Sequence, residues 1–238
     1  MKDPRALSED EIEAIEKLSL RWLHSAVLDF GFEAWDIFYQ SLDEVKDIAE
    51  DLTREMLDRM GCYHIQQRVY GNVDYRKAVY VIQQDSTVRQ AMFVDSKAEK
   101  TAATATMQMS QLSMTVKQQR GGQVVDIQGK LSPISAYDGD NYLTTTLLVH
   151  YGYADEEGKR ILRSATLAAI PNGRLQHLYN PDPTDTIWRA GRNAPSRGED
   201  FRVRLCFADL KEKKPWRVQR VVYNADGQRA TGDWEDEA

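Results

Sequence analysis

The sequence is poor in cysteine and lacks long apolar runs. Its two cysteines, Cys62 and Cys206, lie far apart and show no spacing typical of a metal site, which argues against a disulfide framework or a zinc cluster. No leader of charged, apolar and small residues opens the chain, so we expect a protein of the reducing cytoplasm. No segment stays apolar over the roughly 20 residues that a transmembrane helix needs, and we expect a soluble protein.

The chain also lacks internal repeats and long linkers, and positive charge is scarce in its first part. Its 238 residues fit a single α/β domain. Residues 1–60 carry 16 acidic and 7 basic side chains, a net charge of −9, whereas residues 189–220 carry 10 basic and 4 acidic side chains, a net charge of +6. A polyanion responds to the local field and not to the whole-chain charge of −6. We expect the C-terminal third to face DNA and the N-terminal helices to face solvent or another subunit.

The most informative pattern is formed by Asp74, Asp95 and Lys97. Side chains at positions i and i+2 of a strand project from one face, so Asp95 and Lys97 point together while Ser96 turns away. A neighbouring strand can place Asp74 beside Asp95, and a hard divalent cation, Mg²⁺, relieves the repulsion between the two carboxylates. Such an ion polarises a phosphate and activates water, which Lys97 would orient. The pattern indicates phosphodiester hydrolysis, against the alternative of a solvated strand end.

Helices are expected in the first quarter of the chain. Ser8 and Glu11 have the spacing of a capping box, and the apolar residues that follow recur at helical intervals to about Phe30. Two further helices are expected over residues 34–40 and 42–60. Glu50 and Asp51, on the last of these, stand close in sequence to the first strand, and either can lend a carboxylate to the metal site.

From about Tyr63 the apolar period becomes that of strands. Residues 78–82 and 88–94 predict a hairpin that carries Asp74 at one end and Asp95 at the other. Residues 101–119, rich in Thr, Met and Gln, predict a loop followed by a helix. Further strands are expected at 123–129, 144–153, 160–168, 201–207 and 216–223. This order predicts helices followed by a mixed sheet with crossing helices.

Arginine is concentrated between residues 177 and 204, where prolines and glycines favour a fixed, non-helical path. The side chains expected to contact DNA there are Asn180, Asp182, Arg192, Asn193, Arg197, Arg202 and Arg204. Arginine can donate two parallel hydrogen bonds to guanine O6 and N7, and Asn193 can do the same for adenine or contact the backbone. Arg202 and Arg204 alternate on one strand face and can reach one groove. The bias favours a G·C-rich site, against the alternative of a solvated edge strand.

Both sets of residues resemble those of the type II restriction endonucleases of the SfiI type, which are related to BglI within the PD-(D/E)xK nuclease superfamily. The resemblance covers most of the chain, and the Asn-Pro-Asp-Pro run at 180–183 and the loop after it are its most specific parts. The other segments that carry it are 7–8, 49–51, 74–75, 94–98, 110–114, 174–175, 190–192, 197–199 and 215–217. The usual proline before the first aspartate is Val73 here.

The resemblance implies a single PD-(D/E)xK nuclease domain with a central mixed sheet flanked by helices. Its parts would be a helical portion (1–60), a catalytic sheet (61–170) and a DNA-recognition loop with its strands (171–225). Its catalytic positions fall on Asp74, Asp95 and Lys97, with Glu50 in support and Mg²⁺ as cofactor, and its guanine-reading positions fall on Arg192 and Arg202.

The resemblance further implies cleavage of double-stranded DNA at an interrupted palindrome similar to GGCCNNNNNGGCC, with 3′ overhangs. It implies assembly as a homodimer or homotetramer and a cognate DNA methyltransferase in the same cell. Two other functions fit parts of the pattern: a structure-specific repair nuclease or junction resolvase, and a DNA-binding protein without catalysis. The arginine-rich loop disfavours the first, and the complete carboxylate and lysine set disfavours the second.

Overall fold

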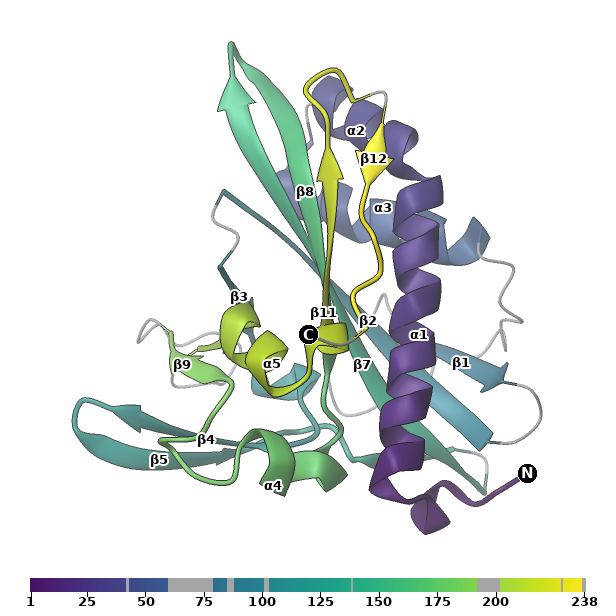
Figure 1. Cartoon of the computed structure of the whole chain (residues 1–238), viewed down its shortest axis with the longest axis vertical. Coiled ribbons are helices and arrows are strands. Elements are labelled where there is room, and N and C mark those ends of the chain that lie inside the picture. Colours follow the sequence, from purple (N-terminus) through teal and green to yellow (C-terminus); the bar gives the residue numbers. More distant parts are fainter. Residues whose placement is uncertain are drawn as a thin grey trace.

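The computed structural model describes residues 1–41, 43–59, 79–84, 88–100, 103–137, 139–191, 202–227 and 229–236, with the backbone alone at 59, 79–84 and 137. A twisted central sheet runs through the molecule, and helices and two small sheets pack around it (Figure 1). This is the mixed α/β architecture expected from the sequence. In the described part of the chain, no helix combines the length and apolar character needed to cross a membrane.

Three helices open the chain after a short 3₁₀ turn, η1 (Pro4–Ala6): α1 (Glu9–Asp29), α2 (Gly31–Gln40) and α3 (Val45–Arg59). The capping box is present, because the Glu11 amide donates to Ser8 Oγ and Glu11 Oε2 accepts from the Ser8 amide. The expected helices are confirmed, although α3 begins later than residue 42 because the Ser41 hydroxyl accepts from the Asp43 amide in a turn.

The central sheet has the order β1-β2-β7-β8-β11-β12, and β6 also pairs with β7. Its strands are β1 (Val79–Gln84), β2 (Val88–Glu99), β6 (Ile134–Tyr137), β7 (Asp140–Glu156), β8 (Lys159–Ile170), β11 (Val218–Tyr223) and β12 (Ala230–Thr231). β2 and β7 are parallel and the other pairs are antiparallel. The expected hairpin of β1 and β2 is confirmed, and the sheet is mixed as predicted.

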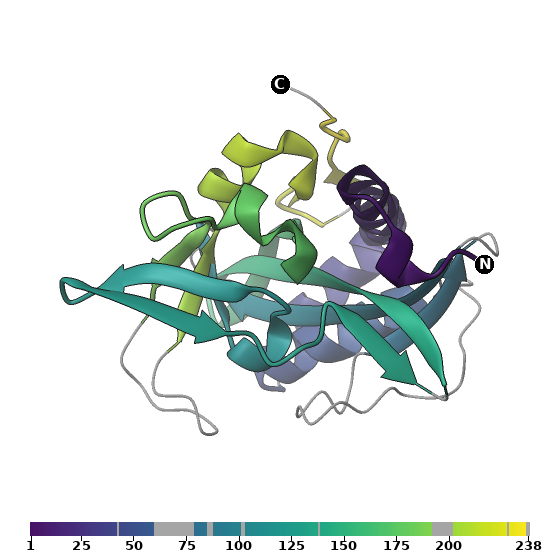
Figure 2. The same ribbon diagram turned by 90° about the horizontal axis from the view of Figure 1, so that it is seen from below.

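Two small sheets extend the structure at one end. One has the order β3-β10-β9, and the other is the hairpin of β4 and β5, which projects from the body of the molecule (Figure 2). Their bounds are β3 (Thr104–Met107), β4 (Thr115–Arg120), β5 (Gln123–Gln128), β9 (Trp188–Ala190) and β10 (Val203–Cys206). The short helices beside them are η2 (Met109–Gln111), η3 (Gly173–Leu175), α4 (Gln176–Tyr179), α5 (Phe207–Lys213) and η4 (Pro215–Arg217).

The helix expected within residues 101–119 is wrong. Residues 104–107 form β3, which pairs with β10 about a hundred positions later in the chain. Ala105 and Met107 are fully buried while Thr104 and Thr106 alternate with them, and this alternation is that of a strand. A tertiary partner therefore decided the structure of a segment whose own composition is ambiguous.

Alternate side chains of the central strands enter two apolar clusters. Leu147 and Val149 of β7 pack in a cluster with α1, α2 and α3, whereas Leu148 between them packs in a second cluster with the small sheets and α5. All three are fully buried. The sheet therefore has no open face along this part of β7.

Candidate active site

Asp95 and Lys97 lie near the end of β2 and point to one side of it. Lys97 Nζ lies 2.8 Å from Asp95 Oδ2, and 13% of the aspartate side chain and 24% of the lysine side chain are exposed. Ser96 points the other way, where its hydroxyl donates to Thr53 Oγ1 of α3 at 2.7 Å. Because α3 is held against the opposite face, the two charged groups share one partly open face.

The surroundings of Asp95 disfavour the charged form of its carboxyl group. Burial raises the pKa of its carboxyl and the charge of Glu50 raises it further, while Lys97 and the Ser96 amide act in the opposite direction. Apart from the ion pair with Lys97, the buried Oδ2 has no hydrogen-bond partner among the described residues. A buried carboxylate oxygen with spare lone pairs is the donor that a hard divalent cation prefers, so this part of the site fits a metal ion.

Of the other expected site residues, Glu50 is described and Asp74 is not. Glu50 lies on α3 with a quarter of its side chain exposed, 3.6 Å from Lys46 Nζ, and its charge reaches Asp95. Asp74 lies outside the described residues. Within the described ranges no three His, Cys, Asp or Glu side chains gather in a metal-binding group, so the described half of the expected metal site consists of Asp95 with Glu50 nearby.

Of the arginines expected to contact DNA, Arg204 lies in β10 and Arg202 directly precedes that strand. Arg192, Asn193 and Arg197 lie outside the described residues. Arg204 of β10 donates from Nε to Thr104 Oγ1 at 2.6 Å and from Nη2 to Glu99 Oε2 at 3.2 Å. Its guanidinium is therefore held between strands β2 and β3.

Arg120 fixes the two ends of the segment that carries Arg192 and Arg197. It donates to the Gly191 carbonyl at 2.8 Å and to the Arg202 carbonyl at 3.3 Å, and the Gly191 amide also donates to the Arg202 carbonyl at 3.0 Å. The sequence reasoning missed Arg120. The only local signal is an arginine directly before the Gly121-Gly122 turn of a strand hairpin.

Asn180 and Asp182 have intramolecular roles. Asn180 is fully buried, and its amide pairs with both backbone groups of Lys117 on β4, at 2.7 Å to the amide and 3.0 Å to the carbonyl. Asp182 is exposed, and its Oδ1 accepts from the backbone amides of Thr184 and Asp185 in a turn. The Asn180 side chain thus forms the pair of hydrogen bonds with β4 that a neighbouring strand would form. Because its oxygen and nitrogen are both used in this pair, they are not available to DNA.

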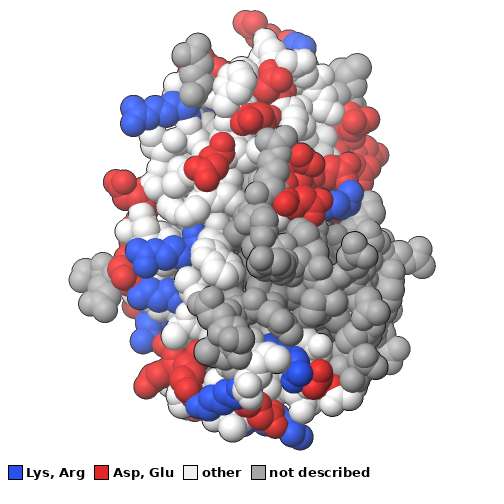
Figure 3. All heavy atoms as spheres, turned by 90° about the vertical axis from the view of Figure 1, so that its right-hand side faces the viewer, with Lys and Arg blue, Asp and Glu red and all other residues white. Residues whose placement is uncertain are grey.

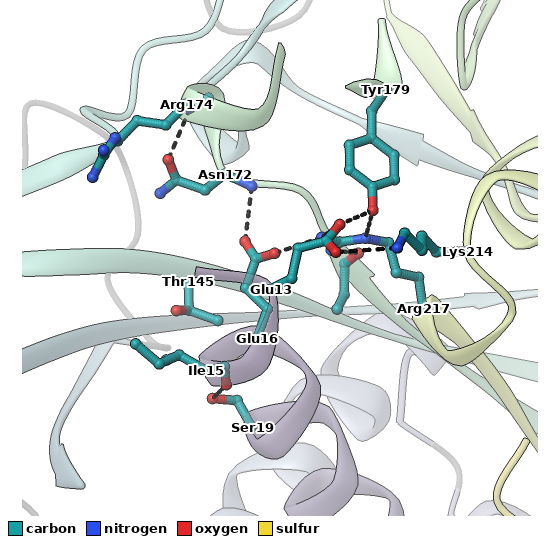
Figure 4. A network of polar contacts seen from close by, with 12 residues as sticks. Glu13, Ile15, Glu16, Ser19, Thr145, Asn172, Arg174, Tyr179, Lys214 and Arg217 are labelled. Carbon is teal, nitrogen blue, oxygen red and sulfur yellow. Dashed lines mark hydrogen bonds and ion pairs between the residues drawn. The ribbon is translucent and has the colours of Figure 1, made fainter. Parts of the chain in front are cut away.

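A buried polar network surrounds Arg217 (Figure 4). Arg217 and Glu16 are both fully buried and lie 2.8 Å apart, and Glu16 also accepts from the Asn172 amide at 2.8 Å. Arg217 Nε donates to the Tyr179 hydroxyl at 2.6 Å, and that hydroxyl contacts Glu13. The network joins α1 to the end of β8, to α4 and to η4.

The basic surplus of residues 189–220 is only partly available to a polyanion. Of its eight described basic side chains, six form ion pairs within the chain, and all but one of these six pair with a carboxylate from another segment. The members are Arg189, Arg204, Lys211, Lys213, Lys214 and Arg217. Net charge along the sequence therefore overstated the positive field of this part, because it could not include partners such as Glu99 and Glu16.

The acidic residues of α2, α3 and the turn between them gather on one end of the molecule. Figure 3 shows acidic side chains over the upper part of the face it displays, the end where Figure 1 places α2. A pocket of about 480 Å³ there is lined by residues of α2, α3 and the turn between them, with no lysine or arginine among the described lining residues. Its carboxylates are Glu33, Asp36, Asp43, Asp47, Asp51 and Glu55. This end repels a polyanion, which is consistent with DNA binding elsewhere.

Comparison with known proteins gives consistent matches. The family model described as "Type II restriction enzyme SfiI" matches residues 25–221. The type II restriction enzyme SfiI of Streptomyces fimbriatus is 36% identical over 250 aligned positions, which cover 99% of this chain and 93% of that enzyme.

Two solved structures have the same fold. The crystal structure of the tetrameric restriction endonuclease SfiI bound to cognate DNA has a TM-score of 0.88 and 34% identity, covering 100% of this chain and 94% of that one. The restriction endonuclease BglI bound to its DNA recognition sequence has a TM-score of 0.71 and 19% identity, with 89% and 90% covered.

Proposed function

Because the chain belongs to the SfiI family of type II restriction enzymes, and is a sequence-specific deoxyribonuclease, we propose that its reaction requires Mg²⁺ and proceeds at the Asp95 and Lys97 face of β2. The observation that carries this proposal is the ion pair itself: a buried carboxylate oxygen with no other hydrogen-bond partner among the described residues, 2.8 Å from a partly exposed ammonium. Asp95 and Asp74 would hold the metal ion, and Glu50 would support them.

Each group then has a chemical role. The bound ion supplies Lewis-acid activation of the phosphate and of a water molecule. Lys97 directs its ammonium toward the face where Asp95 lies, so it is placed to orient the attacking water and to offset charge that develops on the phosphate oxygens. The ion pair with Asp95 keeps that ammonium in place before DNA arrives. The tight contact between Ser96 and α3 keeps the strand from turning.

For specificity we propose contacts from Arg192, Asn193, Arg197, Arg202 and Arg204, with Asp182 at the start of the segment. Arginine pairs bidentately with guanine in the major groove, which supports a G·C-rich site, and the membership of the SfiI family leads us to propose an interrupted palindrome similar to GGCCNNNNNGGCC. We further propose 3′ overhangs, a cognate methyltransferase that protects the host DNA, and a homo-oligomer. The support for the oligomer is the similar SfiI structure, which is a tetramer on cognate DNA.

The test is digestion of a DNA of known sequence in Mg²⁺, followed by sequencing of the fragment ends. The ends give the half-sites, the spacer and the overhang together. Lys97→Ala should lose cleavage by a factor of about 10³ or more and keep specific binding when Ca²⁺ replaces Mg²⁺. Lys100→Ala is the matched control, because Lys100 is an exposed lysine three residues away that pairs with Asp155. Full cutting by Lys97→Ala would refute the site, and cuts determined by DNA shape would refute the specificity.

A further inference from the structure

Glu99 continues the alternation that brings Asp95 and Lys97 together. It is the last residue of β2, two positions beyond Lys97, so its side chain leaves the strand on the same face. On the parallel neighbour β7, His150 is the register partner of Lys97. Lys97, Glu99 and His150 therefore belong to one patch of the sheet, and Glu99 is its member nearest to strand β3.

Glu99 is also the point where the catalytic strand meets the proposed recognition strand. Arg204 of β10 lies 3.2 Å from Glu99 Oε2. The same guanidinium is fixed by Thr104, whose hydroxyl accepts from Nε at 2.6 Å and whose carbonyl accepts from Nη2 at 3.3 Å, and Nη1 lies 3.4 Å from Thr106 Oγ1. These contacts hold the guanidinium in one plane, and Glu99 supplies the only charged one among those described.

His150 offers the Glu99 carboxylate a second partner. It is fully buried, and neither ring nitrogen has a hydrogen-bond partner among the described residues. Its Nε2 lies 3.8 Å from Glu99 Oε2, and its ring meets Phe207 edge to face at 5.6 Å between centroids. Buried polar atoms without partners are rare in proteins and call for an explanation. A small rotation of Glu99 would bring the carboxylate within hydrogen-bond distance of this imidazole.

We propose that Glu99 is a positioning residue that couples Arg204 on the recognition strand to Lys97 on the catalytic strand. This inference rests on the proposed function. In the free protein the carboxylate holds Arg204. When Arg204 turns to DNA, the carboxylate loses a cation and moves toward His150, which lies beside Lys97. The engagement of DNA by β10 is thereby transmitted to the strand that carries the ammonium.

The test is the variant Glu99→Gln, which keeps the shape of the side chain and removes its charge. We expect kcat for a cognate duplex in Mg²⁺ to fall about tenfold, a change typical of directly coupled residues, while the Kd for the same duplex in Ca²⁺ stays within about threefold. Arg204→Met should lower kcat similarly, and the double variant should lose no more than the worse single variant. Additive losses, or an unchanged kcat, overturn the proposal.

The matched control is Glu156→Gln. Glu156 is also a strand-end carboxylate paired with an arginine, Arg163, but at the exposed tip of β7 and β8. Its replacement should leave kcat and Kd unchanged. If Glu99→Gln does not fold, His150→Gln provides the same comparison of kcat with Kd, and equal losses in both overturn the coupling. Wild-type protein in the same assay tests the proposed function separately, because a wild type that does not cut would contradict that function, whereas a failure of the coupling alone would leave wild-type cleavage intact.

Discussion

Arg217 and Asp95 both have buried charged atoms, but Arg217 has many more hydrogen-bond and ion-pair partners than Asp95. Each nitrogen of the Arg217 guanidinium donates to an oxygen, from Tyr179, from the Ala169 carbonyl or from Glu13 and Glu16, and its Cζ lies 4.4 Å from the ring centroids of both Tyr179 and Trp216. Asp95 Oδ2 has the ion pair with Lys97 and no other partner among the described residues.

This difference separates two uses of charge. A buried charged group whose hydrogen-bond partners are all present links the elements that supply those partners. Removing the group leaves its charged partner buried without compensation. A buried carboxylate with an unused oxygen is held ready for a partner that is not part of the chain. The surroundings of Arg217 should therefore control stability, and those of Asp95 should control activity. Replacing Arg217 should lower the free energy of unfolding, and replacing Asp95 should raise it.

The largest expected effect is that of Arg217→Met. It leaves Glu16 fully buried without its cation, and breaking a buried pair in this way costs about 3–5 kcal/mol. Urea denaturation followed by tryptophan fluorescence should show a lower midpoint with a similar slope. Arg5→Met is the control, because the Arg5 and Asp3 pair is exposed and its loss should leave the midpoint unchanged. An unchanged midpoint for Arg217→Met would remove the first half of the comparison.

Asp95→Asn should change the free energy of unfolding by a smaller amount and in the opposite direction. In the absence of metal it removes an underpaired buried charge, and the free energy of unfolding should rise by about 1 kcal/mol while cleavage is lost. Burial raises the pKa of Asp95 in the folded protein. The gain in stability of Asp95→Asn over wild type is thus absent below the ordinary aspartate pKa of 3.8. It grows as the pH rises from there toward the pKa of Asp95 in the folded protein. A variant less stable than wild type at neutral pH would contradict this prediction.

The smallest effect concerns metal removal. If Asp95 binds Mg²⁺, the ion stabilises the folded state by about 0.4 kcal/mol at a concentration equal to its Kd, and the Tm of wild type should rise with added Mg²⁺ and return on chelation. Asp95→Asn should show no such rise, whereas Arg217→Met should keep it from its lower starting Tm. Equal shifts in wild type and Asp95→Asn would show that the ion binds elsewhere.

Much of the fold was predictable because its signals are local. The capping box of Ser8 and Glu11, and the alternation that places Asp95 with Lys97 and Ser96 behind them, depend only on neighbours in the sequence. The strand at 104–107 was not predictable, because its pairing with β10 is supplied by residues far along the chain.

The candidate site divides in the same way. The alternation of Asp95 and Lys97 predicted that their side chains share one face of a strand, as they do, and the concentration of arginine predicted the proposed recognition segment. The internal roles of Asn180 and Arg120 could not be predicted, because their partners are backbone groups of Lys117, Gly191 and Arg202 that any residue type would supply. Side-chain patterns in a sequence carry no record of such contacts.

The contact of Arg120 with two backbone carbonyls has a consequence for how such enzymes diverge. Since the arginine binds the main-chain carbonyls of Gly191 and Arg202, this contact does not itself require any particular side chain between the two positions. Gly191 is constrained, because a Cβ there would lie 2.4 Å from the Arg202 carbonyl oxygen. The proposed recognition residues between them can therefore be exchanged during evolution, and new target sequences acquired, while this anchor stays as it is.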